Sequence, residues 1–243
     1  MENFILEGNI SVKAAILGGV RDIQEVIVDK NKKDRDTTWI LYRAKERHIP
    51  IRLRSREEIN AMAQGHTHGG ILCICTERRY QTLAQCDHGE SCFFALIEGV
   101  EDPFNFGSVL RTLYASGCDG IIYPKRDWQN ATSIIVKGSA GASEYLPQIC
   151  YEDSSEILRE LQARKIELYC AERKNAVNLY NVHFPSRICM AIGGEMRGLS
   201  KAIKEASKQN VYIPYGREVR NALNAVSAAA ILSFEILRQK QRG

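Results

Sequence analysis

The sequence has no paired cysteines of the kind that bind structural zinc, no long apolar run and no secretion signal at its start. Its eight cysteines include no C-x-x-C pair, which excludes zinc fingers and related metal folds. No stretch of about 20 apolar residues is present that could span a bilayer, and the residues after Met1 contain no apolar run of the length found in a secretion signal. We therefore expect a cytoplasmic protein without metal or membrane contact, whose free cysteines act as small hydrophobic residues.

The composition is that of a folded globular protein. Hydrophobic residues make up 44% and charged residues 26% of the 243 residues, enough to build a core without disulfide or metal support. This length suits one large domain or two small ones. The net charge of +4 permits a polyanionic partner but does not require one.

The chain is predicted to form two α/β regions, over residues 1–80 and 92–243, with a polar linker over residues 81–91. In the first region we expect strands over 23–28, 49–53 and 71–76 and helices over 39–47 and 56–63. In the second we expect strands over 92–98, 120–123, 166–171, 187–192 and 210–214. We expect helices over 106–116, 200–208 and 218–239, and a further helix that is capped by Ser154 or Ser155 and runs to residue 165. This alternation predicts an open, mostly parallel sheet with helices on both faces.

A basic cluster lies in the first region. Its six cations face a single acid, Glu46, and are Arg43, Lys45, Arg47, Arg52, Arg54 and Arg56. Such a density of positive charge suits an RNA phosphate backbone. A solvated helix face followed by a strand with outward arginines explains the cluster equally well, so the charge pattern leaves both interpretations open.

Three junctions in the second region interrupt apolar strands with glycine and polar residues, at the strand ends where parallel sheets bind ligands. In the first junction, Asn105 is placed to cap a helix that begins at Phe106. Arg111 then lies on a largely apolar helix, where a guanidinium needs an anionic partner or an opening to a site. Taken alone, Arg111 is more simply explained as a surface arginine at the helix edge.

The second and third junctions come later in the chain. Gly193, Gly194 and Gly198 in the second allow a ligand to approach the backbone closely. The pattern is neither a P-loop nor a dinucleotide fingerprint, because the required lysine and glycine spacing are missing. In the third, Asn224 lies inside the start of an alanine-rich helix, where asparagine is unfavourable unless its side chain makes a hydrogen bond.

In order, the three junctions resemble the motifs of the SpoU (TrmH-type) branch of the SPOUT RNA 2′-O-ribose methyltransferases. Motif 1 is matched at Asp102, Pro103, Asn105, Gly107 and Arg111, motif 2 at Gly193, Glu195, Gly198, Leu199 and Ser200, and motif 3 at Ile213, Pro214, Leu223, Asn224 and residues 228–230. Residues 137–147 are similar to the Ser-Ala-Gly-Ala segment between motifs 1 and 2. Residues 1–80 are similar to the ribosomal-protein-like RNA-binding domain that precedes the catalytic domain in many members.

The resemblance implies a SPOUT-type parallel sheet with a C-terminal trefoil knot over about residues 187–238. It also implies a homodimer that uses S-adenosylmethionine and no metal. The residues implied in cofactor binding are Gly193, Gly194, Gly198, Leu199, Ile213, Pro214, Leu223 and Asn224, and those implied in RNA binding are Arg43, Lys45, Arg47, Arg52 and Arg54. Ribosomal RNA is implied over tRNA by analogy.

The resemblance also assigns roles in catalysis. Arg111 would reach the cofactor of a partner chain and stabilise charge that develops in the transition state. A pKa above about 12 makes arginine a poor proton acceptor, so the base is not assigned. Asn105, Glu195 and Asn224 would position Arg111 and the loops, although Glu195 can equally be a helix N-terminal carboxylate.

Motif 3 departs from the family at two points. Ala222 stands where the family has serine, and the loop over residues 213–223 is one residue longer. These changes keep open an RNA-binding protein that has the fold but no turnover, and a tRNA 2′-O-methyltransferase is a further alternative. A nucleotide-binding oxidoreductase is disfavoured, because neither a glycine fingerprint nor an acidic ribose ligand follows the first strand of the second region.

Overall fold

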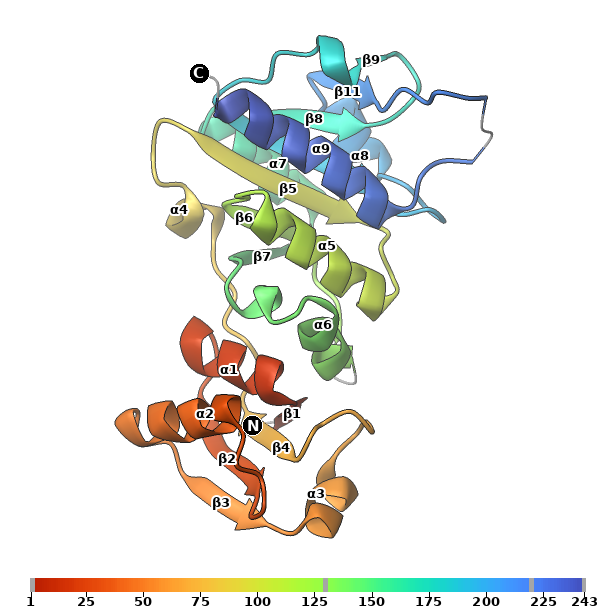
Figure 1. The fold of residues 1–243 in the computed structure, drawn as a ribbon. Helices are drawn as coiled ribbons and strands as arrows, with labels where there is room; N and C mark the ends of the chain where they lie inside the picture. The colour runs from red at the N-terminus through yellow and green to blue at the C-terminus, as the bar shows by residue number, and fades with distance from the viewer. Residues whose placement is uncertain (1–2, 129–130, 219–220, 242–243) are drawn as a thin grey trace. The chain divides into compact units, whose positions relative to one another are not determined.

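The computed structural model describes residues 3–128, 131–218 and 221–241, which form two compact units (Figure 1). The first unit contains the chain up to Arg79 together with Trp128–Tyr145, and the second contains Tyr80–Asp127 and the chain from Leu146 onward. No helix in the described ranges is both long and apolar enough to cross a membrane.

The first unit is built on a four-stranded sheet in the order β1-β4-β2-β3. Its strands are β1 (Phe4–Glu7), β2 (Ile23–Asp29), β3 (Ile51–Arg54) and β4 (Ile71–Cys75), and its helices are α1 (Asn9–Gly18), α2 (Arg35–Glu46) and α3 (Arg56–Met62). β4 runs antiparallel to both β1 and β2, whereas β2 and β3 are parallel. Cys73 and Cys75 are buried in β4, in agreement with their alternation in the sequence.

Helix α2 begins four residues before the predicted start at residue 39. Asp34 caps it by accepting a hydrogen bond from the Thr37 backbone N–H, so the helix begins inside the polar segment that follows β2. The prediction of α3 is confirmed, and Ser55 and Glu58 form a reciprocal capping box at its start.

Two short helices, α6 (Thr132–Gly138) and η2 (Ala142–Glu144), belong to the first unit although they come late in the sequence. Val136 of α6 joins the same apolar cluster as Leu6 and Ile16. η2 lies so close to α1 that a Cβ atom on Gly18 would be 2.2 Å from the Glu144 carbonyl oxygen. This approach therefore requires glycine at position 18.

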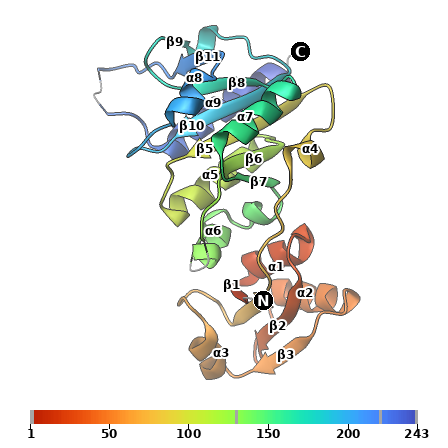
Figure 2. The same cartoon turned by 180° about the vertical axis from the view of Figure 1, so that it is seen from behind.

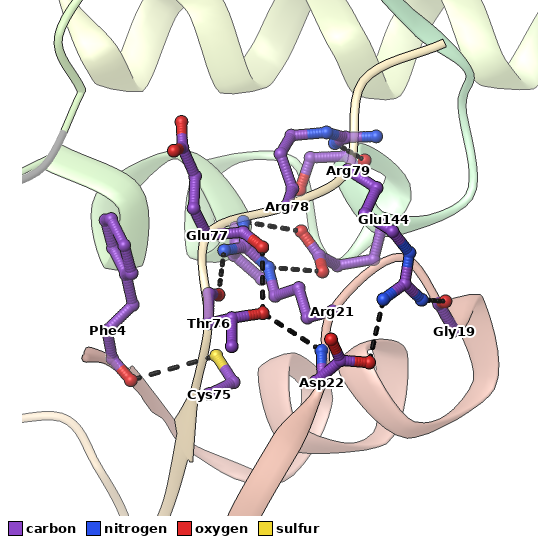
Figure 3. A network of polar contacts seen from close by, with 12 residues as sticks. Phe4, Gly19, Arg21, Asp22, Cys75, Thr76, Glu77, Arg78, Arg79 and Glu144 are labelled. Atoms are coloured by element: carbon purple, nitrogen blue, oxygen red, sulfur yellow. Dashed lines mark hydrogen bonds and ion pairs between the residues drawn. The ribbon is translucent and has the colours of Figure 1, made fainter. Parts of the chain in front are cut away.

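A buried ion pair fixes η2 in the first unit. Arg21 Nε lies 2.8 Å from Glu144 Oε2, and Arg21 Nη2 donates to Glu144 Oε1 at 3.2 Å (Figure 3). The two side chains are 4% and 0% exposed. An exposed pair, Arg79 and Asp22, lies in the same network.

The second unit contains a seven-stranded sheet in the order β7-β6-β5-β10-β8-β11-β9, in which every described pairing is parallel. The parallel sheet predicted from the sequence is thus confirmed. The strands are β5 (Cys92–Glu98), β6 (Gly120–Pro124), β7 (Gln148–Tyr151), β8 (Glu167–Ala171), β9 (Ala176–Asn178), β10 (Arg187–Gly193) and β11 (Gln209–Tyr212).

Helices cover both faces of this sheet, as expected. They are α4 (Leu83–Cys86), α5 (Pro103–Ala115), α7 (Ser154–Ala163), α8 (Lys201–Glu205) and α9 (Ala225–Lys240), with a 3₁₀ turn, η3 (Leu179–Asn181). α5 and α9 lie side by side on one face (Figure 1), and α7 and α8 lie on the other (Figure 2).

In the second unit, the predicted starts of α5, α7 and α9 are wrong, and each error concerns the capping residue. α5 begins at Pro103 because Asp102 is the cap and proline suits the first helical position. Asn105 therefore does not cap α5. Asp153 caps α7 in place of a serine. α9 begins at Ala225, behind its cap Asn224, and not at residue 218; residues 219–220 of the predicted helix lie outside the described residues.

Candidate active site

The first and second junctions pack backbone against backbone at the carboxyl ends of β5 and β10. Gly194 N–H donates to the Glu98 carbonyl oxygen at 2.7 Å. A Cβ atom on Gly194 would lie 2.0 Å from the Gly99 carbonyl oxygen, and one on Gly193 would lie 2.7 Å from Leu199 N. The contact between the two junctions therefore requires Gly194, and the turn within the second junction requires Gly193, a reason that the sequence did not reveal.

The Glu98 side chain ties the second junction to the sheet. Its carboxylate accepts hydrogen bonds from Tyr151 Oη at 2.6 Å, Ser200 N at 2.6 Å and Ser200 Oγ at 3.2 Å. Burial and the adjacent Glu98 carboxylate raise the pKa of Tyr151, so the phenol stays protonated and donates a hydrogen bond to Glu98. Sequence reasoning missed Glu98, although an acid that ends an apolar strand was the available signal.

A cleft of about 200 Å³ opens where β8, β10 and β11 end and α9 begins. Its lining consists of Ala171, Glu172, Arg173, Ile192, Gly193, Val211, Tyr212, Ile213, Tyr215, Ala222, Leu223 and Ala228. The set brings together the second and third junctions, at the edge where a parallel sheet binds ligands.

Three of the predicted cofactor residues, Gly193, Ile213 and Leu223, line this cleft. Gly194 and Gly198 form an isolated bridge in the adjoining turn, and Leu199 packs into the core, 5% exposed. Pro214 and Asn224 are not among the lining residues but follow Ile213 and Leu223 directly in the chain.

Asn224 and Glu195 secure the beginning of α9. Asn224 Oδ1 accepts a hydrogen bond from Ser227 N at 2.8 Å, which is the side-chain bond expected from its place in an alanine-rich helix. Glu195 Oε1 accepts from Ala225 N at 3.2 Å. Glu195 is therefore a carboxylate at a helix N-terminus, where the helix dipole favours negative charge, and it links the second junction to the third.

Arg111 lies on the exposed face of α5 and does not line the cleft of its own chain. Within the described ranges its side chain has no hydrogen bond or ion pair. On the same helix, Phe104 is 61% and Tyr114 48% exposed, and Phe234 on the neighbouring α9 is 47% exposed. Asn105 is the third residue of α5, and its backbone N–H donates to Asp102 Oδ1 at 2.7 Å.

The basic cluster is partly neutralised by acids from elsewhere in the first unit. Its ion pairs are Arg43–Glu46 at 2.7 Å, Arg52–Glu25 at 2.6 Å, Arg54–Glu58 at 3.9 Å and Arg56–Asp29 at 2.9 Å. Arg47 donates to the Ile16 carbonyl oxygen, whereas Lys45 is exposed and has no ion pair among the residues that the structure describes. Counting acids only between Arg43 and Arg56 in the sequence omits Glu25, which lies on β2 and pairs with Arg52.

One wall of the cleft was absent from the sequence-based prediction. Tyr215 Oη accepts a hydrogen bond from Leu223 N at 2.9 Å, and the Arg173 guanidinium carbon lies 4.6 Å from the centroid of the Tyr215 ring. The neighbouring Glu172 carboxylate accepts from Arg173 N at 2.8 Å. Glu172 and Arg173 directly follow β8, so their place at the end of a predicted strand was the signal that could have found them.

In the part of the chain that the structure describes, His, Cys, Asp and Glu side chains form no group of three or more able to hold a metal ion. All eight cysteines carry free thiols.

Comparisons with known proteins identify the family. Residues 92–234 match the model of the SpoU rRNA methylase family, and residues 5–81 match that of RNA 2′-O ribose methyltransferase substrate binding. A TrmH family tRNA/rRNA methyltransferase of Staphylococcus aureus is 29% identical in sequence to this chain, and the match covers 99% of this chain and 98% of the length of that protein.

Solved structures share the fold over nearly the whole chain. The SpoU methyltransferase AviRb of Streptomyces viridochromogenes has a TM-score of 0.85, is 20% identical and is covered over 91% of its length by 99% of this chain. An AdoMet-bound rRNA methyltransferase of Sinorhizobium meliloti has a TM-score of 0.81 at 20% identity, over 97% of this chain and 87% of that chain. With the family model matching more than half of its residues, this chain belongs to the SpoU rRNA methylase family of RNA methyltransferases.

Proposed function

We propose that this protein transfers a methyl group from S-adenosylmethionine to a ribose 2′-hydroxyl of ribosomal RNA. The observation that carries the proposal is the cleft formed by the second and third junctions, in a chain of the SpoU family. The description of the N-terminal family model supports the ribose position. AviRb was also solved with AdoMet, which supports the cofactor.

The residues of the cleft fit this cofactor. Ile192, Val211 and Leu223 provide an apolar wall for an adenine ring, and Glu172 and Arg173 provide charged groups for the ribose and amino-acid parts. S-adenosylmethionine supplies an electrophilic methyl carbon bonded to a sulfonium. The protein must therefore bind and orient this group and leave its methyl side open to RNA.

The ribose hydroxyl is a weak nucleophile, so the protein must also stabilise the negative charge that develops on its oxygen. We assign this role to the positively charged guanidinium of Arg111. Arg111 does not line the cleft of its own chain. We therefore propose that it acts in the cleft of a second subunit.

A homodimer formed through α5 and α9 would satisfy this requirement. The exposed aromatic side chains of Phe104, Tyr114 and Phe234 on these two adjacent helices support an interface there. Asn105 is on the same helix as Arg111, and Glu195 and Asn224 hold the beginning of α9. We propose that these three residues position Arg111 and the loops across the interface.

We further propose that residues 1–80 bind the RNA substrate and that residues 92–243 form the methyltransferase domain, with the threaded C-terminus typical of its family. Of the cations proposed for RNA contact, Lys45 lacks an ion pair among the described residues, whereas Arg43, Arg52 and Arg54 have acidic partners. The eight free thiols are consistent with the proposed cytoplasmic location.

The test is methyl transfer from labelled S-adenosylmethionine to ribosomal RNA, with tRNA as the competing substrate and mapping of ribose methylation to find the nucleotide. Arg111→Ala should abolish transfer and leave cofactor binding in calorimetry within a factor of about two, because Arg111 is assigned to the charge that develops on the ribose oxygen in the transition state and not to cofactor binding. Full transfer by this variant would contradict the assigned role.

A second candidate is an RNA-binding protein without turnover. It is favoured by Ala222, which lines the cleft without the hydroxyl that the family motif carries there. Absence of detectable S-adenosylmethionine binding, together with retained RNA binding, would support this candidate and contradict the methyltransferase.

A further inference from the structure

One wall of the cleft is a guanidinium stacked on an aromatic ring. The guanidinium carbon of Arg173 lies 4.6 Å from the centroid of Tyr215, and both side chains line the cleft. The attraction between a cation and the face of an aromatic ring holds the guanidinium at this position. The contact therefore limits where Arg173 can place its hydrogen-bond donors.

The Tyr215 ring is itself held in place. Its hydroxyl oxygen accepts a hydrogen bond from Leu223 N at 2.9 Å, and Leu223 lines the cleft immediately before the cap of α9. Arg173 follows β8, and Tyr215 follows β11. The stack thus connects the ends of two strands with the beginning of a helix.

The positive charge of Arg173 is uncompensated in the described structure. Among the described residues, no carboxylate lies within ion-pair distance of its guanidinium. Glu172, the other charged residue of the lining, accepts a hydrogen bond from the Arg173 backbone N–H. The cleft therefore presents a cation with several free donors beside an apolar wall.

We propose that Arg173 binds the carboxylate of the amino-acid part of the methyl donor and that Tyr215 is a positioning residue for Arg173. This inference rests on the proposed function, because it takes the cleft as the donor site. A guanidinium binds a carboxylate through two parallel hydrogen bonds, and the apolar wall leaves the opposite side for the adenosine. The pair would distinguish donor-like ligands from nucleosides that lack the amino-acid group.

The test compares two ligands that differ in this group, S-adenosylhomocysteine, which has the carboxylate, and methylthioadenosine, which does not. Calorimetry on the full chain gives both affinities. The wild type should prefer S-adenosylhomocysteine. Arg173→Ala should weaken S-adenosylhomocysteine binding about tenfold to a hundredfold, the effect of losing hydrogen bonds between charged groups, and change methylthioadenosine binding less than about twofold.

Variants of neighbouring residues separate charge, stacking and fold. Lys174→Ala removes an exposed cation next in the chain that does not line the cleft, and it should leave both affinities unchanged. Tyr215→Phe keeps the ring and should keep most of the ligand preference, whereas Tyr215→Leu removes the stack and should lower the preference. Arg173→Lys should restore only part of it, because lysine lacks the planar pair of donors.

Two outcomes overturn the proposal. The first is an equal loss of affinity for both ligands in Arg173→Ala. The second is an unchanged preference for S-adenosylhomocysteine over methylthioadenosine in Arg173→Ala, when the circular dichroism of this variant matches that of the wild type. If the wild type binds neither ligand, the proposed function fails, and the assignment of Arg173 fails with it. A wild type that binds both ligands with equal affinity refutes only the role of Arg173.

Discussion

The buried ion pair between Arg21 and Glu144 offers a test of how η2 is held in the first unit. Glu144→Gln keeps the shape of the side chain and removes its charge. The Arg21 guanidinium would then keep its positive charge at a position where its side chain is 4% exposed, facing a neutral amide. Its hydrogen bond to the Thr76 carbonyl oxygen, at 3.1 Å, would remain but cannot neutralise the charge.

The expected cost is large because the bonding is bidentate and buried. Breaking a buried ion pair by removing one partner typically lowers the free energy of unfolding by about 3–5 kcal/mol. The exposed pair between Asp22 and Arg79 in the same network is a matched control, with side chains 75% and 56% exposed. Asp22→Asn should cost at most about 1 kcal/mol, since surface ion pairs are screened by water.

The measurement is urea unfolding followed by circular dichroism, on both single variants, on Arg21→Met and on the Arg21→Met/Glu144→Gln double variant. Because the partners are in contact, the cost in the double variant should fall short of the sum of the single costs by about 0.5–3 kcal/mol. Additive costs, or a cost for Glu144→Gln no larger than that for Asp22→Asn, would refute the reasoning.

Two further predictions concern the second unit. Gly194→Ala should lower the free energy of unfolding by roughly 1–3 kcal/mol and weaken S-adenosylmethionine binding, because the added Cβ would lie 2.0 Å from the Gly99 carbonyl oxygen. Thermal melts and calorimetry measure the two effects. Gly216→Ala is the control, because no atom lies within 4 Å of its added Cβ. The hydrogen bond from Arg187 lowers the pKa of Asp87, so this carboxylate stabilises the fold above the ordinary aspartate pKa of about 4 and the contribution disappears as the pH falls below it. Urea unfolding at several pH values should show that the free energy of unfolding falls less at low pH in Asp87→Asn than in the wild type. An equal pH dependence of this free energy in the two proteins would count against the assignment.

The elements with strong local signals were predictable from the sequence. β5 and β10 are uninterrupted apolar runs, as expected for strands buried on both faces of a parallel sheet. The short edge strand β9 has only three residues and no apolar pattern, and sequence reasoning missed it. Helix starts failed where two capping residues compete, as Asp102 and Asn105 do before α5.

The site was predictable where a junction follows a strand and not where it depends on distant contacts. Gly193 and Ile213 line the cleft at the ends of β10 and β11, and Leu223 lines it just before the start of α9, so each lies at the boundary of an element that the sequence pattern marks. The tight fit of Gly194 against Gly99 depends on residues far apart in the chain. The stack of Arg173 on Tyr215 likewise joins two loops, and no local pattern indicates which residues of two loops will meet.

The membership of Trp128–Tyr145 in the first unit has a practical consequence for protein engineering. The chain passes between the units three times, near residues 79, 127 and 145. A cut in the polar segment after residue 80 would produce an N-terminal fragment without Val136 in its core and without the carboxylate that neutralises Arg21. Chimaeras that exchange substrate specificity between relatives would therefore need two grafts, the N-terminal residues and this internal segment, transplanted together.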